Sequence, residues 1–458
     1  MLGQVFERFV EKSPLSVMVR AALERVLGAD RLDQWYDRTA QKQYTRDLLF
    51  STVYDLMSQV VFCVQPSVRA AYQAHKAEVG TSIISVYNKL SGLETHTSAE
   101  LVRYSAREFT PLIAHMGGQR EPWLQGYRTK IIDGNCLEAS EHRIKELRQA
   151  KGRALPGKSL VVYEPAYGLV RDVFPCEDGH AQERSLLGEV LKTVEADDLW
   201  IADRNFCTRA FLSEIDARGG CFVIREHQGL PFEILSPLRS CGRTPTGQLA
   251  QQRVCVVDEQ GQRHVLRRLR ITLDHATRDG ATLLYILTNV PRQVSTKRVA
   301  QLYHKRWNVE TAFKHIEAYF HSEINTLGYP KAALFGFCLA LVAYNLLGVV
   351  LAALRSVHGE DTVDHEVSLY YIANELSTTY HGMMIAIPAA EWDVFYAMKT
   401  AELAAILLDL ARRVRLQAFR KSPRRPKNPP PKGTKTLRKG HVSTAKLLMN
   451  RQAHSATP

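Results

Sequence analysis

Two short stretches, YRTKIID (residues 127–133) and LWIAD (residues 199–203), decide the expected fold of this chain. Each is an apolar run typical of a β-strand, and each ends on an aspartate that is followed by turn-forming residues. A side chain at the end of a strand is held rigidly and still reaches solvent. We therefore expect Asp133 and Asp203 to be fixed, accessible carboxylates.

A third carboxylate, Glu310, lies in the stretch YHKRWNVETAFKHIEAYF (residues 303–320), which has the periodicity of an amphipathic helix. At 100° per residue, one narrow polar stripe holds Tyr303, Arg306, Glu310, Lys314 and Glu317. The apolar stripe beside it consists of Val309, Ala312, Phe313, Ile316 and Phe320. Burial of the apolar stripe is expected to press Glu310 against the two aspartates.

Three carboxylates cannot share a site without cations. Two Mg²⁺ ions about 3.5–4 Å apart would neutralise such a site and hold the attacking and leaving oxygens of a displacement at phosphorus. Mn²⁺ shares this preference for hard oxygen ligands, whereas the chain lacks the thiolate or histidine spacing that Zn²⁺ prefers. The residues indicate metal-dependent phosphoryl transfer, with water or a DNA 3′-hydroxyl as the nucleophile.

Each of these residues also has an ordinary structural interpretation. An aspartate before Gly-Asn commonly forms a turn, and Asp203 could cap a helix that begins near Thr208. Arg306 and Glu310 could be a surface ion pair of little energetic worth. The functional interpretation depends on the conjunction of all three carboxylates in this order.

The pattern Tyr303-x2-Arg306-x3-Glu310 resembles the Tyr-Arg-Glu-Lys signature of DDE transposases from bacterial insertion sequences, specifically the insertion-sequence-four group. Asp133 before Gly134, and Asp203 three residues before Phe206, also resemble that group, and the resemblance covers about residues 13–355. It implies an α/β fold, with a ribonuclease H-like mixed sheet flanked by helices, a β-rich insertion and an N-terminal helical domain. The implied roles are catalysis and metal binding for Asp133, Asp203 and Glu310, and phosphate-backbone contact for Tyr303 and Arg306.

One position departs from the signature, because Glu317 stands where the family has lysine, seven residues after Glu310. We expect Lys314, one turn earlier on the same stripe, to supply the missing DNA contact. The alternative is a decayed, weakly active copy, since an acidic side chain repels phosphate.

Charge is unevenly distributed along the chain. Fourteen of the 60 Lys and Arg residues lie in residues 410–458, which contain no Asp or Glu, so 46 basic residues face 47 acidic ones elsewhere. The net charge of +13 therefore belongs to a proline-rich tail that is expected to be disordered and to attract phosphate non-specifically. A solubilising or targeting role is the alternative for this tail.

Two further basic regions are candidate DNA contacts. In a β-rich insertion between Asp203 and Glu310, alternation places Arg268 and Arg270 on one strand face, although such a face can simply be solvated. In the N-terminal region, residues 67–79 and 82–89 on either side of Gly80 could form a helix-turn-helix. Its candidate contacts are Arg69, Lys76 and Lys89.

The uncharged stretch of residues 332–354 is long enough to cross a bilayer, but it stands alone and contains Tyr344 and Asn345, so we expect a buried helix and no membrane partner. The eight cysteines show no C-x-x-C pairing, and no N-terminal signal is apparent, which favours the cytoplasm.

The expected domains are a DNA-binding helical domain (1–117), a catalytic domain in two parts (118–225 and 296–357), an insertion (226–295), a helical region for dimer contact (358–410) and the disordered tail (411–458).

The resulting hypothesis is a transposase that binds terminal inverted repeats and target DNA, nicks a strand at the element end and joins the freed 3′-hydroxyl to target DNA. Pairing of two ends implies a homodimer. Two alternatives remain: a ribonuclease H-like nuclease that cuts without joining, and a catalytically silent, transposase-derived DNA-binding protein.

Overall fold

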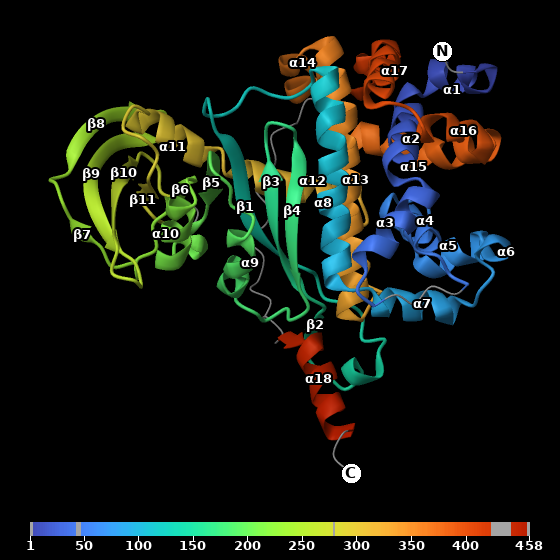
Figure 1. Cartoon of the computed structure of the whole chain (residues 1–458), viewed down its shortest axis with the longest axis horizontal. Helices are drawn as coiled ribbons and strands as arrows, with labels where there is room; N and C mark the ends of the chain where they lie inside the picture. The colour runs from blue at the N-terminus through green and yellow to red at the C-terminus, as the bar shows by residue number, and fades with distance from the viewer. Residues whose placement is uncertain (1–2, 43–46, 278–279, 423–440, 456–458) are drawn as a thin grey trace.

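The computed structural model describes residues 3–42, 47–277, 280–422 and 441–455. A mixed sheet of ten strands runs through the molecule, with two long helices across one of its faces and a further helical layer beyond them (Figure 1). The strand order is β4-β3-β1-β5-β6-β11-β10-β9-β7, and β8 pairs with β9. The strands are β1 (Arg128–Cys136), β3 (Lys158–Glu164), β4 (Leu169–Cys176), β5 (Asp198–Ala202), β6 (Cys221–Arg225), β7 (Glu233–Ile234), β8 (Arg239–Thr244), β9 (Gly247–Val257), β10 (Arg263–Leu273) and β11 (Leu283–Thr288).

The first five strands in this order define the fold. β4, β3 and β1 are successively antiparallel, while β1, β5 and β6 are parallel to one another. All five residues of β5 are buried, as expected for a central parallel strand that is covered on both faces. Three antiparallel strands followed by two parallel ones, with helices on the sheet, form the ribonuclease H-like arrangement, so the predicted α/β fold class is confirmed.

The region between β6 and the helices that follow is rich in strands, as predicted, but these strands do not form a separate sheet. β11 pairs antiparallel with β6, and β10, β9 and β7 follow outward, so the insertion continues the central sheet. In Figure 1 these strands curve into an arc at the far end of the molecule. The insertion is part of the central sheet because β11 forms hydrogen bonds with β6. The local hydropathy pattern of the sequence could not predict which strands pair.

Two hydrophobic cores lie on opposite faces of the sheet. The smaller core includes Trp200 and Phe211 and is covered by α9 (Leu187–Leu191) and α10 (Arg209–Ala217). The larger core joins the sheet to α8 (Thr95–Met116), α13 (Pro330–His358) and the surrounding helices. Those helices are α1 (Glu7–Lys12), α2 (Pro14–Leu27), α3 (Ala29–Thr39), α4 (Phe50–Val61), α5 (Val68–Ala74), α6 (Lys76–Val79), α7 (Ile83–Gly92), α14 (Glu360–Glu366), α15 (Leu369–Ala386), α16 (Ala389–Tyr396) and α17 (Thr400–Arg413).

Helix α13 contains the bilayer-length apolar stretch. In the part of the chain that the structure describes, it is the one helix long and apolar enough to span a membrane, and 94% of its apolar window is buried inside the protein. Its only fully internal amide, Asn345, accepts a hydrogen bond from the Val170 N–H (2.7 Å) and donates to the Val170 carbonyl (2.9 Å) and to Ser105 Oγ (3.0 Å). The helix therefore docks on the edge strand β4 through polar contacts as well as apolar packing, as expected for a core helix.

The candidate helix-turn-helix is interrupted. His75 separates α5 from α6, and Gly80 adopts a left-handed conformation (φ 65°) before α7 begins. Ser67 and Ser82 cap α5 and α7 by accepting hydrogen bonds from backbone N–H groups three residues on. The predicted turn at Gly80 is present, but the helix predicted before it is two short helices.

The prediction of a disordered tail is wrong for part of residues 411–458. Residues 423–440 and 456–458 lie outside the described residues, but β12 (His441–Ser443) and α18 (Thr444–Ser455) are regular elements. β12 pairs parallel with β2 (Arg153–Leu155), and Ser443 Oγ donates to Asp178 Oδ1 at 2.6 Å. Pairing between segments almost 290 residues apart stabilises this strand, which composition alone does not indicate.

Candidate active site

Asp133 and Asp203 are brought together by the register of two parallel strands. Ile131 of β1 lies opposite Ile201 of β5, and each aspartate follows two residues later. Because side chains two residues apart lie on the same face of a strand, both carboxylates lie on the face to which Ile131 and Ile201 contribute core side chains. The sequence-predicted pair is therefore adjacent, at the carboxyl ends of neighbouring strands.

The strand boundaries differ from the prediction at one of these aspartates. Asp203 directly follows β5, as expected, and is the N-terminal flank of a short 3-10 helix, Arg204–Phe206. Asp133, by contrast, is an internal residue of β1, which continues to Cys136 because β3 pairs with it as far as Lys158. The prediction that Asp133 ends its strand is wrong, since the antiparallel partner extends β1 through Gly134.

The predicted helix of residues 303–320 is divided in two. α11 (Thr296–His304) ends before Lys305, and α12 (Trp307–Tyr319) begins after Arg306. The periodicity predicted that Tyr303 and Glu310 share one continuous helical stripe. This prediction is wrong, because the two residues lie on different helices. Val309, Ala312 and Ile316 are buried against the larger core, which places Glu310 in the first turn of α12 on the same side of the sheet as Asp133 and Asp203.

Arg306, which lies between α11 and α12, links the carboxylate of β1 to the carboxylate of α12. Its Nη1 donates to Asp133 Oδ2 at 3.1 Å and its Nη2 donates to Glu310 Oε1 at 2.7 Å. The arginine side chain is 9% exposed, and its Nε is buried without a hydrogen-bond partner. The guanidinium thus lies between two carboxylates and compensates the charge that the sheet and α12 bring together.

The electrostatics of Asp133 reflect this crowding. Burial raises the pKa of Asp133 to about 6, Arg306 and the Gly134 N–H oppose the rise, and Glu310 and Asp203 add to it. Burial likewise raises the pKa of Tyr303 to about 12. The charge of Arg306 opposes this rise, and the charge of Asp203 adds to it. Asp133 therefore lies close enough to Glu310 and Asp203 for their charges to raise its pKa.

The chemistry of the donors fits a hard divalent cation, because all three side chains offer carboxylate oxygens. Among the described residues, however, no three His, Cys, Asp or Glu side chains approach closely enough to hold a metal ion. Arg306 supplies the positive charge between Asp133 and Glu310 instead. Metal ligation by these residues would therefore require the guanidinium to move aside.

Two carboxylates near this site were not anticipated from the sequence. A Cβ on Gly134 would lie 2.1 Å from Glu183 Oε1, and Glu183 Oε2 accepts a hydrogen bond from Asn205 Nδ2 at 3.3 Å. Glu183 therefore lies beside the residues that follow both aspartates. It belongs to a short 3-10 helix (Glu183–Leu186), and no strand or periodic pattern marks its position.

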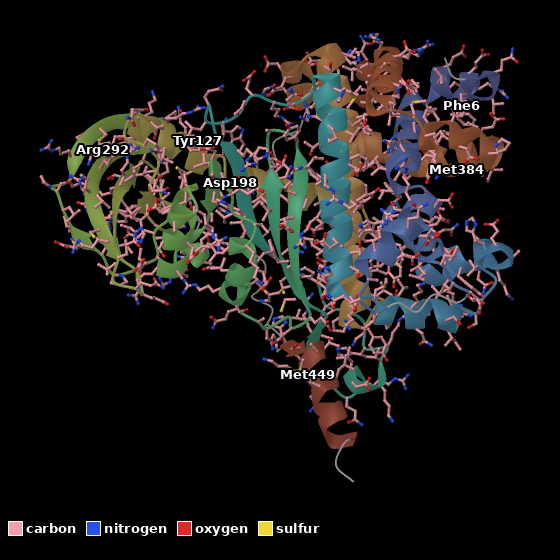
Figure 2. The ribbon with its side chains drawn as sticks, viewed as in Figure 1. Phe6, Tyr127, Asp198, Arg292, Met384 and Met449 are labelled. Atoms are coloured by element: carbon pink, nitrogen blue, oxygen red, sulfur yellow. The ribbon has the colours of Figure 1, made fainter. Side chains whose placement is uncertain are left out.

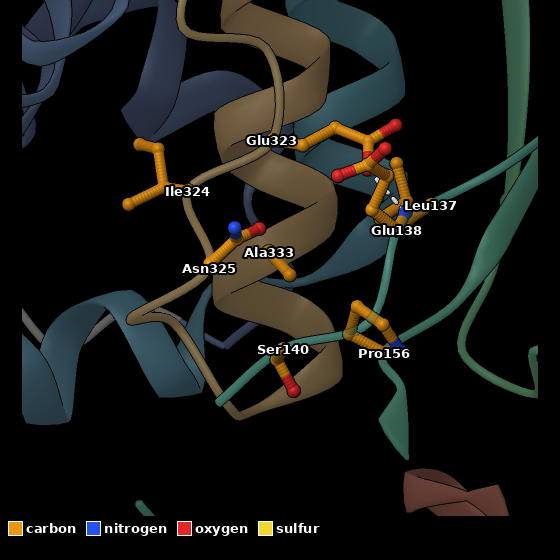
Figure 3. A pocket seen from close by; sticks show the side chains of 8 residues that line it. All are labelled: Leu137, Glu138, Ser140, Pro156, Glu323, Ile324, Asn325 and Ala333. Atoms are coloured by element: carbon orange, nitrogen blue, oxygen red, sulfur yellow. Dashed lines mark hydrogen bonds between the residues drawn. The ribbon is translucent and has the colours of Figure 1, made fainter. Parts of the chain in front are cut away.

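The second unanticipated carboxylate, Glu323, lies beyond the end of α12. Its side chain bends toward the segment after β1 and accepts a hydrogen bond from the Glu138 backbone N–H (Figure 3). Burial raises the pKa of Glu323 to about 7, the Glu138 N–H opposes this, and the charges of Glu138 and Glu317 reinforce it. Glu317 therefore lies near a second acidic side chain, that of Glu323.

The other candidate DNA contacts differ in their availability. Lys314 is exposed on α12, and no hydrogen bond or ion pair engages it within the described part of the chain. Arg268 is engaged, because it makes two hydrogen bonds to Glu226 (2.5 and 2.8 Å) and stacks over Tyr285. Arg270 is half-buried on the same strand. Lys314 is therefore the most accessible of these three cations.

The segment that contains the ribonuclease H-like sheet matches a family whose members are nucleases of the polynucleotidyl-transferase type. Residues 124–346 match the protein family described as Transposase DDE domain. This match includes the three carboxylates, Tyr303, Arg306 and the whole central sheet, and it supports a DDE transposase. No curated protein matches the chain.

Proposed function

We propose that this chain is the transposase of an insertion sequence similar to the insertion-sequence-four group, with Asp133, Asp203 and Glu310 as its catalytic metal ligands. The observation that carries the proposal is the β1–β5 register, which sets two aspartates side by side facing a helix whose glutamate shares an arginine with one of them. DDE transposases generally use divalent metal ions. Mg²⁺ or Mn²⁺, bound as a pair, would activate the nucleophile and stabilise the leaving oxygen.

The chain's own residues position the reacting strand. Arg306 neutralises Asp133 and Glu310 before DNA binds, and release of its guanidinium would provide a bidentate donor for the backbone phosphate next to the scissile bond. Tyr303 is buried beside Arg306 and fixes the direction from which that arginine approaches. Lys314, one turn beyond Glu310, offers a second phosphate contact.

Other surfaces would bind DNA away from the reaction. Arg69 on α5 and Lys76 on α6 are exposed and suit recognition of the terminal inverted repeats, whereas Lys89 donates to the Leu48 carbonyl and is less available. Arg268 and Arg270 of β10 remain weaker candidates because of their packing. Helices α14 to α17 are the proposed dimer contact in a synaptic complex, which would act in the bacterial cytoplasm.

The test is cleavage and joining of a plasmid that carries the gene's flanking ends, in Mg²⁺, Mn²⁺ or EDTA. The native chain should nick and join in either metal, and Glu310→Gln should abolish both products because it removes a ligand charge without changing side-chain size. Glu259→Gln, an exposed turn residue distant in sequence from the site, is the matched control. Cutting without joining would favour the nuclease, and metal-independent end binding without cutting would favour the silent DNA-binding protein.

A further inference from the structure

A second polar site lies away from the carboxylates, where α13 crosses the β3–β4 turn. A cavity of about 20 Å³ is lined there by Arg120, Tyr163, Gly168, Tyr344, Leu347, Gly348, Leu351 and Arg355. α13 approaches the turn closely, since a Cβ on Gly348 would lie 3.0 Å from the Gly168 carbonyl oxygen. A volume of roughly 10–15 Å³ is enough for one water molecule, so this cavity can hold one small ligand.

The polar side chains around the cavity are all hydrogen-bond donors. They are two guanidinium groups, Arg120 and Arg355, and two phenols, Tyr163 and Tyr344, and no carboxylate lines the space. The hydroxyl groups of the two tyrosines interact with each other, and a Cβ on Gly168 would lie 3.1 Å from Arg120 Nη1 and 3.9 Å from the Tyr163 hydroxyl. Because the guanidinium groups can only donate and the phenols can donate as well, an acceptor is the complementary occupant.

Arg355 has a buried hydrogen-bond donor that lacks a partner within the described part of the protein. Its side chain is 3% exposed, its Nε donates to the Gly118 carbonyl at 3.1 Å, and its Nη2 is buried without a hydrogen-bond partner. A buried charged donor without a partner is costly, and native proteins normally satisfy it with an ordered water or ion. Arg355 Nη2 therefore indicates that something occupies the cavity in solution.

The charge balance favours an anion over water. Arg120 binds Asp364 through two hydrogen bonds, of 2.8 and 3.0 Å, whereas Arg355 lies 3.6 Å from the same carboxylate. The buried Arg355 and the partly buried Arg120 thus share one close carboxylate, and the next, Glu360, is 4.0 Å from Arg120 and half-exposed. Burial and the neighbouring charge of Arg120 lower the pKa of Arg355 to about 10, so the arginine stays charged at neutral pH.

We propose that this cavity is a binding site for a small monovalent anion of chloride size, held by Arg355 Nη2 and a tyrosine hydroxyl. The bound anion ties α13 to the β3–β4 turn and, through Arg120 and Asp364, to α14 and the segment that leads into β1. Occupancy therefore stabilises the junction between the catalytic sheet and the helices that surround α13.

The experiment is thermal unfolding of the full chain in EDTA without DNA, with chloride exchanged for gluconate at constant ionic strength. Gluconate is far too large for the cavity. The native chain should show a saturable rise of roughly 3 °C in Tm as chloride replaces gluconate, as expected for a ligand that binds only the folded state. Equal Tm values in the two salts would overturn the proposal and leave water as the occupant.

Variants localise the effect. Arg355→Met should lower Tm in both salts and abolish the chloride dependence. The variant Arg292→Met, at an exposed arginine labelled at the left of the molecule in Figure 2, should retain it. Tyr344→Phe keeps the fold and should shift the chloride midpoint upward several-fold. Full chloride dependence in Tyr344→Phe and Arg355→Met would overturn the assignment, and neither result depends on transposase activity.

Discussion

Arg306 donates a hydrogen bond to Asp133 across 173 positions of sequence, at 3.1 Å, while its other terminal nitrogen holds Glu310 at 2.7 Å. One guanidinium thus compensates a buried strand carboxylate and a helix carboxylate together. The relative position of Asp133 and Glu310 is therefore stabilised by a cation that belongs to the chain itself.

Arg306→Met should leave Asp133 buried beside two like charges. We expect a loss of roughly 2 kcal/mol in the free energy of unfolding in EDTA, which is less than the usual cost of breaking a buried pair because Glu310 is partly solvated. Added Mg²⁺ should raise the urea midpoint of the variant more than that of the native chain, since the metal replaces the lost cation. Arg292→Met serves as the control, and an unchanged midpoint in EDTA would show that the bridge is not stabilising.

Glu323 should make stability depend on pH. Its pKa is raised to about 7 in the folded chain, above its value when unfolded, so the unfolded state loses this proton first as pH rises. Its stabilising contribution is present below about pH 4.5 and is lost as pH increases through about 7. Glu323→Gln should be more stable than the native chain at pH 8 by roughly 1–2 kcal/mol and similar to it at pH 4.5.

Urea unfolding at pH 4.5, 6 and 8 measures this difference, with Glu259→Gln as a control for a solvated carboxylate. Parallel pH profiles for the native chain and Glu323→Gln would contradict the assignment of the titration to Glu323.

The sequence was sufficient to predict that Asp133 lies on one strand and that Asp203 directly follows another, because apolar runs and the turn residues after them are local features. It was also sufficient for the buried helix α13, where an uninterrupted apolar stretch contains a single internal amide, Asn345. The ends of β1 and the pairing of β12 were not predictable locally, since partner strands distant in the sequence determine them. Periodicity also missed the break at Lys305, because residues on either side fit the same 100° repeat.

Asn345→Leu should destabilise the docking of α13 on β4. Leucine keeps the volume but leaves the Val170 N–H and carbonyl, together with Ser105 Oγ, without their buried partner. Because buried polar groups that lose their partners are costly, we expect a loss of about 3 kcal/mol in the free energy of unfolding. Ser105→Ala removes only one of the three hydrogen bonds and should cost about 1 kcal/mol by the same measurement.

Gly134→Ala should affect the active site more than the fold. The added Cβ would meet the flexible Glu183 carboxylate at 2.1 Å, so Glu183 must rotate away and release Asn205 beside Asp203. We expect a small change in Tm and a clear fall in the cleavage rate. Glu183→Ala in the same chain removes the clash and should recover part of the rate, whereas an unrecovered double variant would mean that Gly134 acts through its backbone alone.

Lys314→Ala tests whether the accessible lysine on α12 contacts the DNA backbone, as proposed above. Loss of one phosphate contact should weaken binding to element ends several-fold and lower the slope of log affinity against log salt by about 1, with equal effects on different end sequences. Lys297→Ala on α11 is the matched control for a helix-surface lysine. Glu317→Lys should increase end binding, because it replaces a charge that repels phosphate with one that attracts it. Unchanged affinity in both variants would exclude this face of α12 from the DNA path.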